Sequence, residues 1–198
     1  LANQRHVDTV STQGVLESFK ERGLLNCDQK NEALIELLRN NYRVVSFKAD
    51  LILWAARKAE FEVSPEADVV FHSIQSRWTS EEDYRKVFSK AVALIWSECR
   101  EPGKRYRWLE KGLLVLRAKQ ADPQKSAEGY LTECLDAFCR LLPGEIRALV
   151  DCILTLAAKN SWRSPHCEDF LLDILRTRQD LLARVGPALP PKILGRLR

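Results

Sequence analysis

Apolar residues recur at intervals of three and four positions along most of the chain, which is the spacing of one face of an α-helix. The segment 26–40, for example, carries Ala33, Leu34, Leu37 and Leu38 among charged residues. The pattern predicts a mainly α-helical fold of about eight or nine helices. These helices are expected over residues 11–23, 26–40, 46–55, 64–78, 79–100, 105–119, 126–142, 144–159 and 165–185.

Residues that begin or end helices lie at the boundaries of these segments. Gly23 can end the first helix in the left-handed conformation, and Asn26 with Gln29 has the spacing of a capping box. Ser64–Pro65 combines a capping residue with a proline at the first helical position. The tail after residue 185 contains three prolines and two glycines, so we expect only its start to pack.

One short segment departs from the helical pattern. Val7–Val10 alternates apolar and polar residues, which is typical of a β-strand. A break after the third helix predicts two units, a remnant of an α/β unit over residues 1–60 and a helical domain over residues 64–198, arranged as a bundle or a short solenoid. The segments 76–83 and 161–169 share a Trp, a Ser and acidic residues, which fits two similar helix starts as well as a repeat.

The composition is that of an ordinary globular protein, with 198 residues of which 45% are hydrophobic and 29% charged. No apolar run approaches the roughly 20 residues of a membrane helix, and no signal-peptide pattern is present. The six cysteines have no metal-binding spacing, so we interpret them as free thiols of a cytoplasmic protein. The chain contains no Met and begins at Leu1, from which we expect a fragment of a larger protein.

The first 57 residues contain short motifs in a characteristic order. A Leu-Ala pair precedes the predicted strand, Thr-x-Gly-Val-Leu follows it, and a charged turn ending in Gly-Leu-Leu and an Asn-Tyr-Arg stretch come next. These motifs lie at Leu1–Ala2, Val7–Val10, Thr12–Leu16, Glu21–Leu25 and Asn41–Val44. In their order and spacing they resemble the closing part of a PIN domain, the nuclease fold of many bacterial toxin ribonucleases.

The resemblance implies an α/β/α sandwich that cleaves RNA with divalent metal ions held by clustered carboxylates. In the family, those carboxylates lie upstream of the part that corresponds to Leu1. Asp8 is the only acidic residue near the predicted strand, and a Mg²⁺ or Mn²⁺ site needs several oxygen ligands. We therefore expect no catalytic residue, metal site or cofactor in this chain, and a divalent metal only in the parent protein.

The net charge of +4 is unevenly distributed, because seven basic and only two acidic residues lie within residues 100–119. There, Gly103–Lys111 interleaves cations with aromatic rings, the combination that binds the phosphates and unpaired bases of single-stranded RNA. The candidate RNA-binding residues are Lys104, Arg105, Tyr106, Arg107, Trp108 and Lys111. The alternative is a helix start with solvated cations and an aromatic ring in the core, and the helical spacing of Leu109, Leu113 and Leu116 favours it.

Together these features favour a non-catalytic helical interaction module from a larger protein with a PIN-like nuclease domain. Its expected partner is another protein or its own upstream domain, with RNA as a further candidate and no membrane. Two alternatives stay open. One is an RNA-binding adaptor or ribonuclease subunit whose metal-binding carboxylates lie upstream of residue 1, and the other is a stand-alone helical scaffold that binds proteins.

Overall fold

The computed structural model describes residues 12–40, 49–74, 80–117, 123–159 and 167–197. Within these ranges the chain forms eleven α-helices and two short 3-10 helices, and it forms no β-strand. The helices are α1 (Thr12–Glu21), α2 (Cys27–Arg39), α3 (Ala49–Lys58), α4 (Pro65–Ile74), α5 (Glu81–Glu98), α6 (Pro102–Arg117), α7 (Pro123–Leu141), η1 (Pro143–Glu145), α8 (Ile146–Lys159), α9 (Cys167–Thr177), α10 (Gln179–Val185), η2 (Gly186–Ala188) and α11 (Pro191–Leu197). The predicted mainly α-helical fold is confirmed.

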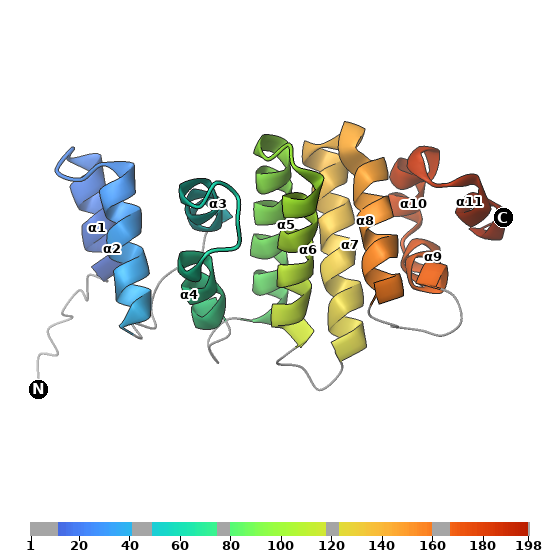
Figure 1. Ribbon diagram of the computed structural model, residues 1–198, viewed down its shortest axis with the longest axis horizontal. Helices are drawn as coiled ribbons and strands as arrows, with labels where there is room; N and C mark the ends of the chain where they lie inside the picture. Colours follow the sequence, from blue (N-terminus) through green and yellow to red (C-terminus); the bar gives the residue numbers. More distant parts are fainter. Residues whose placement is uncertain (1–11, 41–48, 75–79, 118–122, 160–166, 198) are drawn as a thin grey trace, which may run out of the picture.

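Consecutive helices form hairpins, and the hairpins stand side by side in one elongated array (Figure 1). The pairs are α1 with α2, α3 with α4, α5 with α6, α7 with α8, and α9 with α10, while α11 packs on α9 at the end of the array. In the middle, α5 packs against both α3 and α7, and α7 also contacts α10. Each central hairpin is therefore covered by neighbours on both sides.

The predicted helix boundaries rest on local hydrogen bonds that the structure contains. Gly23 adopts a φ of 72° after α1, the left-handed conformation that glycine accepts without strain. At the start of α2, Asn26 Oδ1 accepts from the Gln29 N–H at 2.8 Å, and Gln29 Oε1 accepts from the Asn26 N–H at 3.0 Å. Ser64 Oγ accepts from the Ala67 N–H at 3.2 Å. These observations confirm the helix end at Gly23, the capping box and the start of α4.

The core is a continuous cluster of buried side chains that extends from α2 to α11. Aromatic rings connect successive hairpins within it. The ring centroids of Phe71 and Phe88 lie 4.6 Å apart, those of Phe88 and Tyr130 6.2 Å apart, and those of Trp96 and Phe138 5.1 Å apart. The same number of residues separates Phe88 from Tyr130 and Trp96 from Phe138, so the two aromatic positions of α5 recur in α7. The two central hairpins thus repeat the same aromatic core positions.

The structure contains more helices than the sequence pattern predicted. The segment 165–185, expected as one helix, is broken between α9 and α10, where Arg178 has φ −119° and ψ 79°. The tail, expected to pack only at its start, forms α11, because Pro191 is compatible with the first turn of a helix and Ile193 is almost fully buried. The predicted strand at Val7–Val10 lies outside the described residues.

The predicted boundary near residue 60 falls between α3 and α4. Ile52 and Ala56 of α3 are fully buried in the same core cluster as Phe88 of α5, and α3 packs along α5. Arg57 also forms an ion pair with Glu98 at 2.5 Å. The described helices on both sides of the boundary therefore share one core, while the division into two units stays a prediction.

Candidate functional site

The predicted RNA-binding residues lie in Gly103–Lys111, which forms the first half of α6 and is called the basic segment here. Trp108 is fully buried, Lys104 and Arg105 are partly buried, and Arg107 is exposed. Successive residues of a helix point in different directions, with 3.6 residues per turn. The segment therefore presents its side chains to several neighbouring elements and not to one open face.

Two side chains of the basic segment hold the backbone of the turn between α3 and α4. Trp108 Nε1 donates to Phe61 O at 2.8 Å, and Lys104 Nζ donates to Glu60 O at 3.0 Å. Glu60 and Phe61 have φ values of 50° and 63°, a left-handed conformation that residues other than glycine rarely adopt. The two donors thus stabilise an unfavourable backbone conformation in a turn that is distant in sequence.

Carboxylates neutralise two of the cations on this side of α6. Arg107 Nη1 binds Glu62 Oε2 at 2.6 Å, and Lys104 Nζ lies 2.8 Å from Glu101 Oε1 and 3.8 Å from Glu62 Oε1. The hydrogen bond to Glu101 raises the pKa of Lys104, and the charges of Glu101 and Glu62 act in the same direction. Both cations are therefore paired with carboxylates of the same chain.

Arg105 joins three elements near the turn between α5 and α6. Its Nε donates to Cys99 O at 2.5 Å and its Nη2 donates to Trp96 O at 2.9 Å. Its Nη1 also binds Glu145 Oε2 at 3.2 Å, and the guanidinium lies over the Trp96 ring at 5.4 Å. Only 16% of the side chain is exposed. Arg105 therefore satisfies the last carbonyls of α5 and links them to η1.

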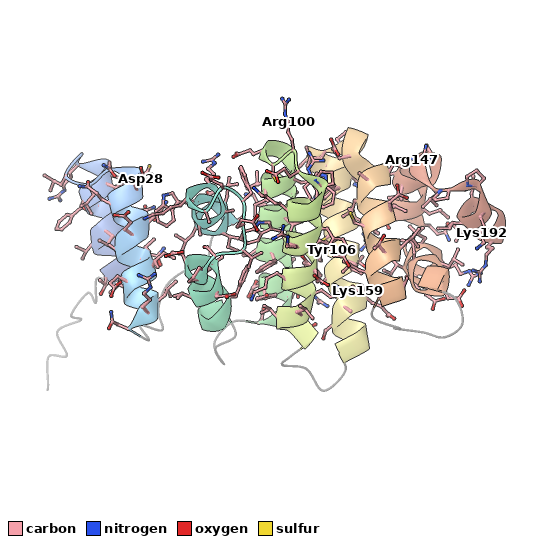
Figure 2. All side chains as sticks on the ribbon, in the orientation of Figure 1. Asp28, Arg100, Tyr106, Arg147, Lys159 and Lys192 are labelled. Atoms are coloured by element: carbon pink, nitrogen blue, oxygen red, sulfur yellow. The ribbon has the colours of Figure 1, made fainter. Side chains whose placement is uncertain are left out.

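Tyr106 and Lys159 lie next to one another on α6 and α8 (Figure 2). Lys159 Nζ is 5.7 Å from the centre of the Tyr106 ring and forms an ion pair with Glu110 at 2.6 Å. Burial raises the pKa of Tyr106, and the hydrogen bond to Glu110 raises the pKa of Lys159. A base stacking on the Tyr106 ring would have to compete with this lysine.

The last candidate, Lys111, faces α4. It forms an ion pair with Asp68, and its Nζ lies 5.5 Å from the centre of the Phe71 ring. The structure thus brings the six predicted residues together on one helix, and each of the four cations among them contacts a carboxylate of the same chain. Binding of RNA by this segment stays a prediction.

In the described residues, no group of three or more His, Cys, Asp or Glu side chains is placed to hold a metal ion. Asp8 lies outside those residues. Cys99 and Cys134 are buried free thiols, as expected, whereas Cys27 is exposed. Within the same part of the chain, no helix has the length and apolarity needed to cross a membrane.

A groove of about 590 Å³ lies between α5 and α7 and is called the α5–α7 groove. Ser89 and Ala137, two small and buried residues, are part of its lining, and their short side chains leave the space between the helices unfilled. Leu141, at the end of α7, also lines the groove and is 50% exposed. The other lining residues are charged: Lys86, Lys90, Glu133, Asp136, Arg140 and Arg178.

Several of these charges have partners on neighbouring turns. Arg140 binds Asp136 at 2.7 Å, and Arg178 binds the two carboxylate oxygens of Asp180 at 2.7 and 2.8 Å. The hydrogen bonds from Arg178 lower the pKa of Asp180 to about 2. These pairs leave little of their charge for an incoming ligand.

Lys90 and Glu133 differ from the other charged groups of the groove. Lys86 binds Glu82 at 2.5 Å, and the pKa of Lys86 is raised chiefly by this hydrogen bond. By contrast, the side chains of Lys90 and Glu133 form no ion pair or hydrogen bond with another residue of the described ranges. The charge of Glu133 still acts on Lys86 and Arg178, so Lys90 is the cation of the groove that is available to an external partner.

Sequence patterns did not identify this groove, because its lining comes from α5, α7 and the junction of α9 and α10. In the sequence, Lys90 and Glu133 resemble ordinary exposed positions of amphipathic helices. Leu141 continues the apolar spacing of Cys134 and Phe138, so nothing local distinguishes it from a core residue. Its exposure accompanies its position as the last residue of α7.

A scan against protein-family models matches no family, and searches of the curated proteins and of the solved structures find no significant match.

Proposed function

We propose that the chain is a non-catalytic helical interaction module, a short solenoid of helix hairpins that binds a protein partner. The observation that carries the proposal is the α5–α7 groove, where Lys90 forms no ion pair or hydrogen bond within the described ranges. Stacked helix pairs commonly provide extended binding surfaces, and pockets of roughly 300–1,000 Å³ accommodate ligands. The groove lies between α5 and α7, which belong to the two central hairpins. Each of these hairpins packs against another hairpin on both sides.

A peptide-selection experiment tests this proposal. The 198-residue chain is immobilised and exposed to a random peptide library displayed on phage, and enriched peptides are synthesised for isothermal titration calorimetry. We expect enriched peptides that share a sequence pattern and bind saturably with one site per chain. Failure to enrich any peptide above a heat-denatured sample of the same chain would contradict the proposal.

We also propose that the module comes from a larger protein with a PIN-like nuclease domain. The support is the ordered set of motifs within residues 1–57. The metal-binding carboxylates would lie in that domain, so the 198-residue chain is expected to release no products from single-stranded RNA in the presence of Mn²⁺. RNA cleavage that disappears in the Asp8→Ala variant would overturn this assignment.

An RNA-binding adaptor is the second candidate function, and the basic segment is the feature that favours it. Because its cations have carboxylate partners, we expect weak or absent retention of single-stranded RNA in a filter-binding assay. The informative variant is Arg107→Ala, which removes an exposed cation and leaves the structural contacts of Lys104 and Arg105 in place. Strong binding that falls steeply with salt and is lost in this variant would establish the RNA-binding function instead.

A further inference from the structure

We infer that the α5–α7 groove binds a peptide segment of a partner protein, with an acidic residue of the peptide facing Lys90 and an apolar residue covering Leu141. The inference deepens the proposed function and rests on it, because it assigns the partner class and the contact residues of the same module. It depends on the charge balance of the groove, on its unpaired groups and on its exposed apolar end.

The unpaired charge of Lys90 favours an acidic residue in the ligand. The groove is lined by four cations and two carboxylates: Lys86, Lys90, Arg140 and Arg178 against Glu133 and Asp136. Most of the cations already contact carboxylates of the chain, whereas Lys90 contacts none in the described ranges. An acidic side chain of a bound peptide would supply this missing partner. Such a pair at the rim of an interface contributes chiefly to specificity and association rate.

The same lining argues for a peptide and against nucleic acid. Glu133 would repel the phosphates of a polynucleotide, and most of the lining cations are already paired with carboxylates of the chain. Among its described lining residues there is no aromatic side chain on which a base could stack. A peptide can instead place charges of both signs, with an acidic residue at Lys90 and a basic or amide residue at Glu133.

Leu141 supplies the apolar part of the interface. It is 50% exposed, one of only four large hydrophobic side chains exposed within the described residues. An apolar side chain of the peptide would cover it at one end of the groove, while Ala137 beside it leaves space for the peptide to approach. Interfaces commonly combine a small apolar centre with charged groups at the rim.

The chain offers matched variants that separate this groove from other surfaces. Lys90→Glu reverses the proposed contact charge, and Lys20→Glu makes the same change at an exposed position of α1. Leu141→Ala removes the apolar contact, and Leu114→Ala removes an equally exposed leucine, 49% against 50%, from α6. All four positions lie at the surface, and circular dichroism checks that each variant keeps the helical fold.

The ligand is the tightest-binding peptide from the phage selection, and its affinity for each variant is measured by calorimetry. We expect Lys90→Glu to weaken binding about tenfold and Leu141→Ala about threefold, with no change in the two control variants. Replacing the conserved acidic residue of the selected peptides by Lys is expected to restore binding to the Lys90→Glu variant. That rescue would not occur if the substitution acted only through the fold.

The inference is overturned if the selected peptide binds the Lys90→Glu and Leu141→Ala variants as tightly as the unmodified chain. In that case the module binds its partner elsewhere, and the proposed function survives without this site. Displacement of the peptide from the unmodified chain by excess single-stranded RNA would also contradict it, because the groove would then prefer the polyanion. If no peptide is enriched at all, the proposed function itself is wrong.

Discussion

The basic segment of α6 and the α5–α7 groove are both rich in charge, but their charged groups have different surroundings. In the basic segment, Arg107 binds Glu62 and Arg105 binds backbone carbonyls of Trp96 and Cys99, so the charges stabilise the array. In the groove, Lys90 has no such partner within the described ranges. A dense cluster of cations in the sequence therefore does not show which of its charges stay unpaired in the folded chain.

The difference follows from the position of the two regions. The basic segment lies where α6 meets the α3–α4 turn and α8, and a charge brought close to packed elements is costly unless it is paired. The groove faces solvent, where water stabilises an unpaired charge at little cost. We expect substitutions of the buried and part-buried residues of the basic segment to change stability, and substitutions in the groove to change binding.

The largest effect is expected for Trp108→Ala. This side chain is fully buried and donates to Phe61 O, so its removal leaves a cavity and an unpaired carbonyl. We expect a loss of about 3–5 kcal/mol in the free energy of unfolding, measured with urea. Arg107→Ala, which breaks only an exposed ion pair, is the control and should cost less than about 1 kcal/mol. Equal effects of the two substitutions would show that Trp108 is not a core residue.

A smaller but clear effect is expected for Arg105→Ala. The substitution removes donors from two carbonyls at the end of α5 and from Glu145, and we expect the free energy of unfolding to fall by about 2 kcal/mol. Arg100→Ala in the same turn is the control, because Arg100 is exposed and points away from the array (Figure 2). Unchanged stability of the Arg105→Ala variant would contradict a structural role for this residue.

A titration tests whether Arg178 is neutralised inside the groove. Arg178 lowers the pKa of Asp180 from 3.8 to about 2. Because the folded value is the lower one, the pair contributes stability above pH 3.8 and loses it as the pH falls through 2. We expect Arg178→Ala to move the pKa of Asp180 back toward 3.8, followed by NMR of its carboxylate carbon. Lys20→Ala should leave it unchanged, and an ordinary pKa of Asp180 in the unmodified chain would contradict the pair.

The smallest effect on stability is expected for Lys90→Ala. Because Lys90 makes no ion pair within the described ranges, we expect the free energy of unfolding to change by less than about 0.5 kcal/mol. Thermal unfolding followed by circular dichroism measures this. A loss comparable to that of Arg105→Ala would mean that Lys90 belongs to the structural set, and the contrast between the two regions would disappear.

Sequence reasoning predicted the local structure well where the signals were local. The capping box of Asn26 and Gln29 and the helix end at Gly23 each depend on residues within four positions of one another, and the structure contains both. The prediction of a single helix over 165–185 was wrong, because no glycine or proline marks the break at Arg178. The extent of packing in the tail was underestimated, because the burial of Ile193 depends on the position of α9.

The sequence by itself determined that this chain is helical and where most helices begin and end, because apolar spacing and capping act between residues three or four positions apart. Only the tertiary structure decided which charges are paired and which face solvent. Arg107 and Glu62 lie 45 positions apart in sequence, and their contact exists only because α6 packs beside the α3–α4 turn. Likewise, the lining of the α5–α7 groove combines residues of α5, α7 and the α9–α10 junction, which no local pattern brings together.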